Sequence, residues 1–279
     1  MSKNKFFKTA KYVARKISAN RMGVYSAQTA FFTFFSLIPL LMLLIMLITQ
    51  FGASSEEMIE KVSDYAPGVL INFIESYYDD ILAANRLSLT IVSIITLLWS
   101  ASKGVYSIVG GLNSVYEIKE SRNPIAVRLL SVLYTVAFIG IVVAALLLMV
   151  FGNAIGEYLY SNFSDIKPIV YIISSLRFII GFVLLVLFFV IIYKALPGTK
   201  LRFIDQIPGA VLSGAGWVSF SIIFSFYIDN FSNYSNIYGS LTAIIALMLW
   251  LYVCMYIMFF GAQVNYILSS KARKADRTN

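Results

Sequence analysis

Long apolar runs, each the length of a membrane span, recur along the chain. A helix needs about 20 consecutive apolar residues to cross the hydrocarbon core of a bilayer. Six segments meet that length, roughly Thr29–Phe51, Leu89–Gly111, Leu129–Gly152, Ile169–Tyr193, Ile207–Ile228 and Ser240–Leu268. The pattern predicts an all-α, polytopic membrane protein in which residues 1–279 form a single membrane domain, a bundle of six transmembrane helices.

The largest predicted loop, residues 52–88, has a helical pattern of its own. Ser54 and Glu57 have the spacing of a capping box, and apolar residues repeat at helical intervals on both sides of Pro67-Gly68. We expect short amphipathic helices in this first outer loop. They either cover the mouth of a cavity or serve packing alone.

Lysine and arginine are distributed unevenly between alternate loops. Seventeen lie in the N-terminal arm (residues 1–21), the second and fourth loops and the C-terminal tail (residues 269–279), whereas three lie in the other loops. Because positive loops stay on the cytoplasmic side, we expect both termini to be cytoplasmic. The net charge of +8 is therefore a topology signal. It gives no reason to expect a nucleic-acid partner, and membrane lipids are the expected partners.

The basic N-terminal arm also has an apolar face. Its apolar residues fall on one side of a helix and most of its cations fall elsewhere; the apolar set is Phe6, Ala10, Val13, Ala14 and Ile17. This arrangement is typical of a helix lying on an anionic membrane surface. The arm either binds that surface or only sets the topology.

The composition supports the membrane assignment and narrows the chemistry. Hydrophobic residues make up 59% of the chain and charged residues 13%, whereas soluble domains have about 25% charged residues. The chain has no histidine and one cysteine, Cys254. The commonest metal ligand and general base is therefore absent from the sequence. We expect no cofactor, no metal and no enzymatic activity.

The second span carries a polar stripe around a lysine. Steps of three or four residues connect Ser93, Thr96, Ser100, Lys103, Ser107, Gly110 and Ser114, which places them on one helical face. A lysine at the centre of a span costs about 2.5–3.5 kcal/mol on insertion scales. Three interpretations of Lys103 remain open: it extends to the interface, it is solvated within a tightly packed bundle, or it contacts an anionic ligand.

Two further spans carry polar or helix-breaking residues. Arg177 lies in the fourth span, where it either reaches the outer interface or faces a substrate. The first span has a polar edge formed by Ser26, Thr29, Thr33 and Ser36. Pro39 favours a kink there because it lacks an amide hydrogen. Kinked helices either line cavities or are packed by a neighbouring helix.

The fifth span begins with small residues at intervals that allow close helix contact. Gly209 with Ser213, and Ala210 with Gly214, are separated by four positions. Such pairs let two helix backbones approach closely in a membrane. We expect helix packing at Gly209, Ser213 and Gly214.

Three blocks of sequence together resemble the BrkB/YihY family of bacterial inner-membrane proteins. They are "SAQTAFFTFFSLIPLL" (26–41), "LLWSASKGVYSIVGGLNSVYEIKESR" (97–122), and the C-terminal "LPGTKLRFIDQIPGAVLSGAGW" with "IYGSLTAIIALMLWLYVCMYIMFFGAQVNYIL". The resemblance implies a six-helix protein of the bacterial cytoplasmic membrane. That family usually has an acidic residue where Gln263 stands, so a charge-dependent role at this position is not expected.

These observations lead to a transport hypothesis. Lys103 and Arg177 would attract the head of an anionic amphiphile, an envelope lipid or its precursor. The Ser and Thr residues of the first two spans would line its path, as in a transporter or flippase. The alternative is a non-transporting membrane scaffold that organises the envelope. The resembling family has carried a ribonuclease label, which the residue inventory of this chain does not support.

Overall fold

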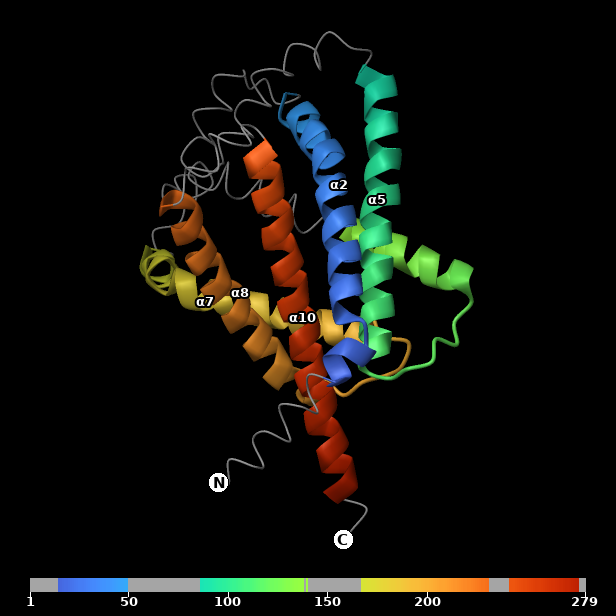
Figure 1. Ribbon diagram of the computed structural model, residues 1–279. Helices are drawn as coiled ribbons and strands as arrows, with labels where there is room; N and C mark the ends of the chain where they lie inside the picture. The colour runs from blue at the N-terminus through green and yellow to red at the C-terminus, as the bar shows by residue number, and fades with distance from the viewer. Residues whose placement is uncertain (1–14, 50–85, 138, 140–166, 231–240, 276–279) are drawn as a thin grey trace. The chain divides into compact units, whose positions relative to one another are not determined.

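The computed structural model describes residues 15–49, 86–137, 139, 167–230 and 241–275, which form helices and contain no strand. The elements are α2 (Met22–Thr49), α5 (Arg86–Val115), α7 (Lys167–Ala195), the short 3-10 helix η2 (Ile204–Gln206), α8 (Ile207–Asn230) and α10 (Leu241–Ala275) (Figure 1). A further helix, Pro124–Ala137, follows α5.

Within the described residues, four helical segments are long and apolar enough to cross a membrane. They are Met22–Met46, Ser88–Val115, Ile204–Ile228 and Ile244–Ser270, and Pro124–Ala137 and Gly181–Ala195 are shorter apolar helices. The described residues of the predicted spans in α2, α5, α8 and α10 are thus helical. The predicted third span, Leu129–Gly152, is described only at residues 129–137 and 139. The amphipathic helices expected in residues 52–88 lie outside the described residues, except that α5 already begins at Arg86.

The chain divides into two compact units. Unit 1 comprises Met1–Phe31, Gly104–Arg128 and Phe178–Asn279, and unit 2 comprises Phe32–Lys103 and Leu129–Arg177. The helices α2, α5 and α7 each contribute one part to each unit.

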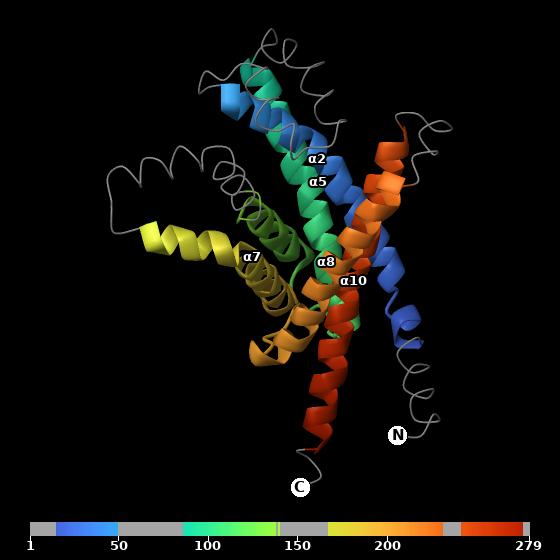
Figure 2. The same cartoon turned by 90° about the vertical axis from the view of Figure 1, so that its left-hand side faces the viewer.

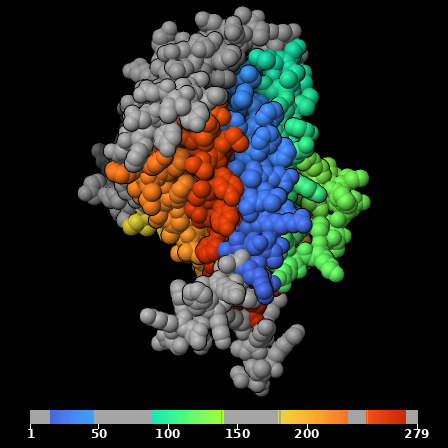
Figure 3. Space-filling model, in the orientation of Figure 1, coloured from blue at the N-terminus to red at the C-terminus, as the bar shows by residue number. Residues whose placement is uncertain are grey.

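In unit 1, α8 and α10 pack backbone against backbone. A methyl group added to Gly209 would overlap the carbonyl oxygen of Gly261, and one added to Gly261 would overlap the hydroxyl of Ser213. Figure 3 shows the two helices side by side on one face of unit 1. Small residues at this crossing let the helix axes approach closely.

The second half of α7 crosses these two helices near the same point (Figure 2). The buried Tyr193 hydroxyl donates to the Met258 carbonyl at 2.6 Å and lies 2.7 Å from the Ser213 hydroxyl. Gly214 faces Phe182 and Val186 of α7. One tyrosine thus joins three helices through hydrogen bonds that satisfy its buried polar end.

The beginning of α2, the end of α5 and the second half of α10 also pack together in unit 1. The Tyr25 ring lies against Gly110 of α5 and its Cβ against Gly111, and the ring centroid is 6.4 Å from that of Phe259 in α10. The lone cysteine, Cys254, is fully buried in α10. The contacts of Tyr25 thus join α2, α5 and α10 within unit 1.

Unit 2 pairs the second part of α2 with the first part of α5. The Ser93 hydroxyl lies 3.8 Å from the Met42 sulfur, and the Thr90 hydroxyl lies 3.4 Å from the Met46 sulfur. Since the residue numbers rise on one helix as they fall on the other, the two segments are antiparallel.

Candidate functional site

Lys103, the centre of the predicted stripe, lies beside two aromatic rings in unit 2. Its ammonium nitrogen is 4.0 Å from the centroid of the Trp99 ring and 5.2 Å from that of Phe32. The two rings meet edge to face, with centroids 6.5 Å apart. Aromatic faces attract cations, most strongly where water is excluded. The side chain therefore has an aromatic environment within its own unit.

The serines of the stripe are buried. Ser93, Ser100 and Ser107 are at most 3% exposed, whereas Ile95 on the opposite face of α5 is 63% exposed. The Ser100 hydroxyl donates to the carbonyl oxygens of Thr96 and Leu97 in its own helix, at 2.7 and 3.2 Å. A serine satisfied in this way needs no polar partner on a neighbouring helix. The stripe thus presents small side chains and few free hydroxyl groups.

The residues of the polar edge predicted on α2 differ in whether their hydroxyl groups have hydrogen-bond partners. The Ser36 hydroxyl donates to the Thr33 carbonyl at 2.7 Å, so it is also satisfied within the helix. Pro39 lies buried inside α2. Thr29, in unit 1, is fully buried, and its hydroxyl oxygen has no hydrogen-bond partner. A buried polar atom without a partner costs free energy, so Thr29 is an unusual position in this edge.

Arg177 lies in α7, but its side chain is outside the described residues. Whether it shares a cavity with Lys103 stays a prediction. Gly209, Ser213 and Gly214 lie at the contacts of α8 with α10 and α7 described above.

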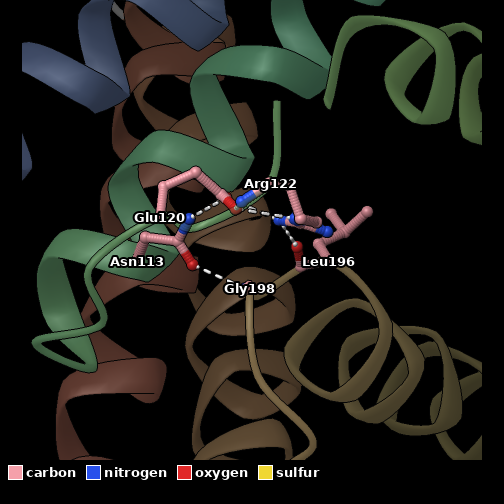
Figure 4. A network of polar contacts seen from close by, with 5 residues as sticks. All are labelled: Asn113, Glu120, Arg122, Leu196 and Gly198. Atoms are coloured by element: carbon pink, nitrogen blue, oxygen red, sulfur yellow. Dashed lines mark hydrogen bonds and ion pairs between the residues drawn. The ribbon is translucent and has the colours of Figure 1, made fainter. Parts of the chain in front are cut away.

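A polar network not anticipated from the sequence joins the loops that follow α5 and α7 (Figure 4). The Asn113 amide donates to the Glu120 carboxylate at 2.6 Å and accepts the backbone N–H of Gly198 at 2.8 Å. Arg122 donates to both Glu120 oxygens and to the Leu196 carbonyl. The Arg122 guanidinium holds the pKa of Glu120 at about 2, well below its ordinary value. The two loops are thus fastened by charge-assisted hydrogen bonds.

A second group of hydrogen bonds holds the beginning of α8. The Asn265 side chain in α10 accepts the backbone N–H of Gly209 at 2.6 Å and donates to the Gln206 carbonyl at 3.0 Å. The Tyr116 hydroxyl donates to the Gln206 side chain at 2.6 Å. Asn265 therefore caps α8 from another helix, since the first amides of a helix lack partners within it.

The end of the N-terminal arm is attached to α5 and α10. The Lys16 ammonium group and the Tyr266 hydroxyl both donate to the Glu117 carboxylate. The Asn20 amide donates to the buried Gln263 side chain at 2.7 Å, and the Ser114 hydroxyl donates to the Asn20 carbonyl. The amide nitrogen of Gln263 is buried without an acceptor.

Glu117 holds this position in an unusual backbone conformation. It has φ 56° at the end of α5, where the Ile118 N–H bonds the Asn113 carbonyl and the Glu117 N–H bonds the Ser114 carbonyl. These bonds form a Schellman motif, in which glycine usually occupies the left-handed position. The hydrogen bond from Lys16 lowers the pKa of Glu117. Glu117, whose carboxylate bonds Lys16 and Tyr266, thus occupies a backbone position where glycine would be less strained.

The described residues offer no group of three or more histidine, cysteine, aspartate or glutamate side chains that could hold a metal ion. Their clustered polar side chains hold helix ends and loops together.

The family model described as virulence factor BrkB matches residues 13–279. The chain belongs to the BrkB family. Among curated relatives of this BrkB-family chain, a ribonuclease-like protein of Bacillus subtilis (strain 168), YfkH, is 34% identical over 90% of this chain and 91% of its own length. The chain is thus a membrane protein of this family, and the resemblance carried by the three sequence blocks is confirmed.

Two further relatives are named as UPF0761 membrane proteins. The one from Glaesserella parasuis serovar 5 (strain SH0165) is 27% identical over 78% of this chain and 75% of its own length. The one from Vibrio vulnificus (strain YJ016) is 26% identical over 94% and 82%. No solved structure matches the chain.

Several of the residues that hold this BrkB-family chain together stand in the blocks that carried the resemblance. Asn113, Glu120 and Arg122 lie in the second block, and Gly198 and Asn265 in the C-terminal one. Periodicity gave no sign of the contacts of Asn113 and Arg122 with the loop after α7, or of Asn265 with Gly209, because these partners are 56 to 85 residues apart in the sequence.

Proposed function

We propose that this membrane protein binds an anionic amphiphile and moves it between the two leaflets, as a transporter or flippase of an envelope lipid or its precursor. The observation that carries the proposal is the position of Lys103. It lies in a helix apolar enough to span a membrane, beside the Trp99 and Phe32 rings. An ammonium group at such depth is costly, and membrane-embedded cations commonly mark substrate paths.

The aromatic surroundings suit an amphiphilic ligand. The rings of Trp99 and Phe32 stabilise a cation without supplying negative charge, so a phosphate or carboxylate head adds an attraction that the rings lack. Their apolar edges can contact an acyl chain at the same time. In this proposal Arg177 supplies a second cation along the path, and Thr29, Thr33 and Ser36 offer hydroxyl groups.

The proposed location is the bacterial cytoplasmic membrane, with both termini in the cytoplasm. Its support is the excess of lysine and arginine in the arm, the tail and the alternate loops. We propose no ribonuclease activity for this chain, although one relative is named ribonuclease-like. The sequence supplies no histidine and a single cysteine, so the usual catalytic bases and metal ligands are scarce.

A scaffold function is the second candidate, and one observation favours it. The hydroxyls of Ser100 and Ser36 are satisfied by carbonyls of their own helices. Such residues suit tight helix packing as well as a polar path. In this alternative the chain organises other envelope proteins and moves no lipid.

A lipid-transfer assay separates the two. The purified protein is reconstituted into vesicles that contain a fluorescent phosphatidylglycerol, and the label reaching the outer leaflet is quenched with dithionite. We expect Lys103→Ala to slow transfer at least tenfold and Lys103→Arg to retain most of it. Lys119→Ala, an exposed lysine in the loop after α5, is the matched control and should transfer at the wild-type rate.

Two outcomes would count against the proposal, the first against transport itself and the second against the role of Lys103. Wild-type protein that transfers no more label than protein-free vesicles favours the scaffold. Lys103→Ala at the wild-type rate removes Lys103 from the path.

A further inference from the structure

The segment that joins α7 to α8 combines cations with exposed apolar side chains. Lys194 lies in the last turn of α7, and Lys200 and Arg202 follow in the loop. All three are exposed, as are Phe203 at 42% and Ile204 at 70%. These five residues are called the basic lip below.

A contact within the basic lip draws its two ends together. The Lys194 ammonium nitrogen is 5.6 Å from the centroid of the Phe203 ring. The cation at the end of α7 therefore lies near the aromatic residue that follows Arg202. An apolar candidate span, Ile204–Ile228, begins at the next residue. The lip thus stands at the boundary between an apolar segment and a charged loop, which is the depth of lipid headgroups.

Two acidic residues of the segment after α5, Glu117 and Glu120, are already engaged. Glu117 is bonded to Lys16, and Glu120 is bonded to Arg122. In the described part of the chain, none of the three lip cations lies within ion-pair distance of a carboxylate, and neighbouring Asp205 forms no ion pair. The positive charge of the lip is therefore available to an anion from outside the chain.

We propose that the basic lip binds the headgroup of an anionic phospholipid. Phe203 and Ile204 enter the apolar layer, and Lys194, Lys200 and Arg202 surround the phosphate. The apolar pair favours a lipid over a soluble anion, because exposed side chains of this size at a membrane boundary gain free energy by leaving water. This site lies on the α7–α8 connection, includes none of the residues around Lys103, and does not depend on lipid transport.

Lipid counting by native mass spectrometry tests the proposal. The detergent-solubilised full-length protein is titrated with phosphatidylglycerol and, separately, with phosphatidylcholine of the same acyl chains. At low ionic strength each basic residue near an anionic surface is worth about 1 kcal/mol, or roughly a fivefold change in affinity. We expect Lys200→Gln with Arg202→Gln to weaken phosphatidylglycerol binding at least tenfold and to leave phosphatidylcholine binding unchanged.

The matched control is Lys119→Gln, which removes one exposed cation from the loop after α5, where neither residue adjacent to it in sequence is an exposed apolar one. It should bind phosphatidylglycerol like the wild type, and so should Phe203→Leu, which keeps the apolar contact. Phe203→Ser with Ile204→Ser should weaken binding although all cations remain.

Each contrary result overturns the proposal. If the Lys200→Gln, Arg202→Gln protein binds phosphatidylglycerol as tightly as the wild type, the two cations are not part of the site. If Lys119→Gln loses as much affinity, the lipid is attracted only by the general positive charge. Displacement of the lipid by inorganic phosphate, beyond the effect of sodium chloride at equal ionic strength, makes the site one for free phosphate. Gel filtration of each variant checks that the protein remains folded.

Discussion

The ammonium nitrogen of Lys103 lies 4.0 Å from the centroid of the Trp99 ring, one helical turn before it in α5. This i, i+4 spacing is encoded in the sequence, whereas the contribution of Phe32 comes from α2. The cation is thus held partly by its own helix and partly by another.

A double-mutant cycle should detect the contact between Lys103 and Trp99. We expect Lys103→Met and Trp99→Leu to be coupled by about 0.5–2 kcal/mol, the range of cation–π pairs from exposed to desolvated sites. Unfolding in mixed micelles of dodecyl maltoside and sodium dodecyl sulfate measures the four free energies. The control cycle pairs Lys103→Met with Trp250→Leu, whose indole donates to Ser221, and should be additive. Coupling of equal size in both cycles would contradict the assigned contact.

Alanine at the crossing of α8 and α10 should strongly destabilise unit 1. The added methyl of Gly261→Ala would overlap the Ser213 hydroxyl and approach the Tyr193 hydroxyl at 2.9 Å, and overpacking of this kind costs about 1–3 kcal/mol or more. Thermal unfolding in detergent should show a lower midpoint. Gly181→Ala in α7 is the matched control, because nothing lies within 4 Å of its added carbon.

In contrast to Gly261→Ala, the control Gly181→Ala should keep or raise the midpoint, since alanine favours a helix over glycine by about 1 kcal/mol. If the two variants unfold alike, close contact at Gly261 is not what stabilises the crossing.

The cap of α8 should depend on the identity of the side chain at position 265. Asn265→Ala removes the acceptor for the Gly209 N–H and leaves that buried amide without a partner, which costs about 1–3 kcal/mol. Asn265→Asp restores the acceptor but sets a carboxylate against the Gln206 carbonyl oxygen, so it should rescue little. Hydrogen exchange of the first α8 amides should accelerate in both variants. Full rescue by aspartate would show that only the acceptor matters.

Acid should loosen the loops after α5 and α7. Because the pKa of Glu120 is about 2 in the folded protein and 4.5 ordinarily, its ionised form stabilises the fold above pH 4.5. That contribution is lost as the pH falls from about 4.5 toward 2. Glu120→Gln should lower the thermal midpoint at pH 7 and flatten its dependence on pH within this window. A midpoint that falls with acid as steeply in Glu120→Gln as in the wild type would assign the effect to other groups.

Apolar periodicity predicted the helices well because a membrane span must satisfy its backbone hydrogen bonds internally over a nearly fixed length. The predicted span Ile207–Ile228 differs from α8 by two residues at its end, and Leu89–Gly111 lies wholly within α5. The observed helix ends differ from the predicted ones where hydropathy does not indicate a boundary. The helix α2 begins at Met22, before the predicted start at Thr29, since a helix continues past the apolar run until the backbone changes direction. Here Arg21, with φ 50°, makes that change.

The polar networks could not be predicted from the sequence pattern. Asn113 meets Gly198, and Asn265 meets Gly209, across long stretches of sequence, and both contacts depend on how the loops and helices pack. The end of α5 was hidden for another reason: Glu117 occupies a position where glycine is the usual signal. By contrast, the stripe around Lys103 was visible because its members share one helical face.

The burial of Cys254 has a practical consequence for work on this chain. With one thiol, enclosed within α10, the natural protein should react slowly with maleimides and serve as its own unlabelled background. A cysteine placed at exposed Lys119 or Ser88 would then be the one site open to a membrane-impermeant reagent. Labelling of intact cells and of inverted vesicles would assign the side of the membrane on which each end of α5 lies.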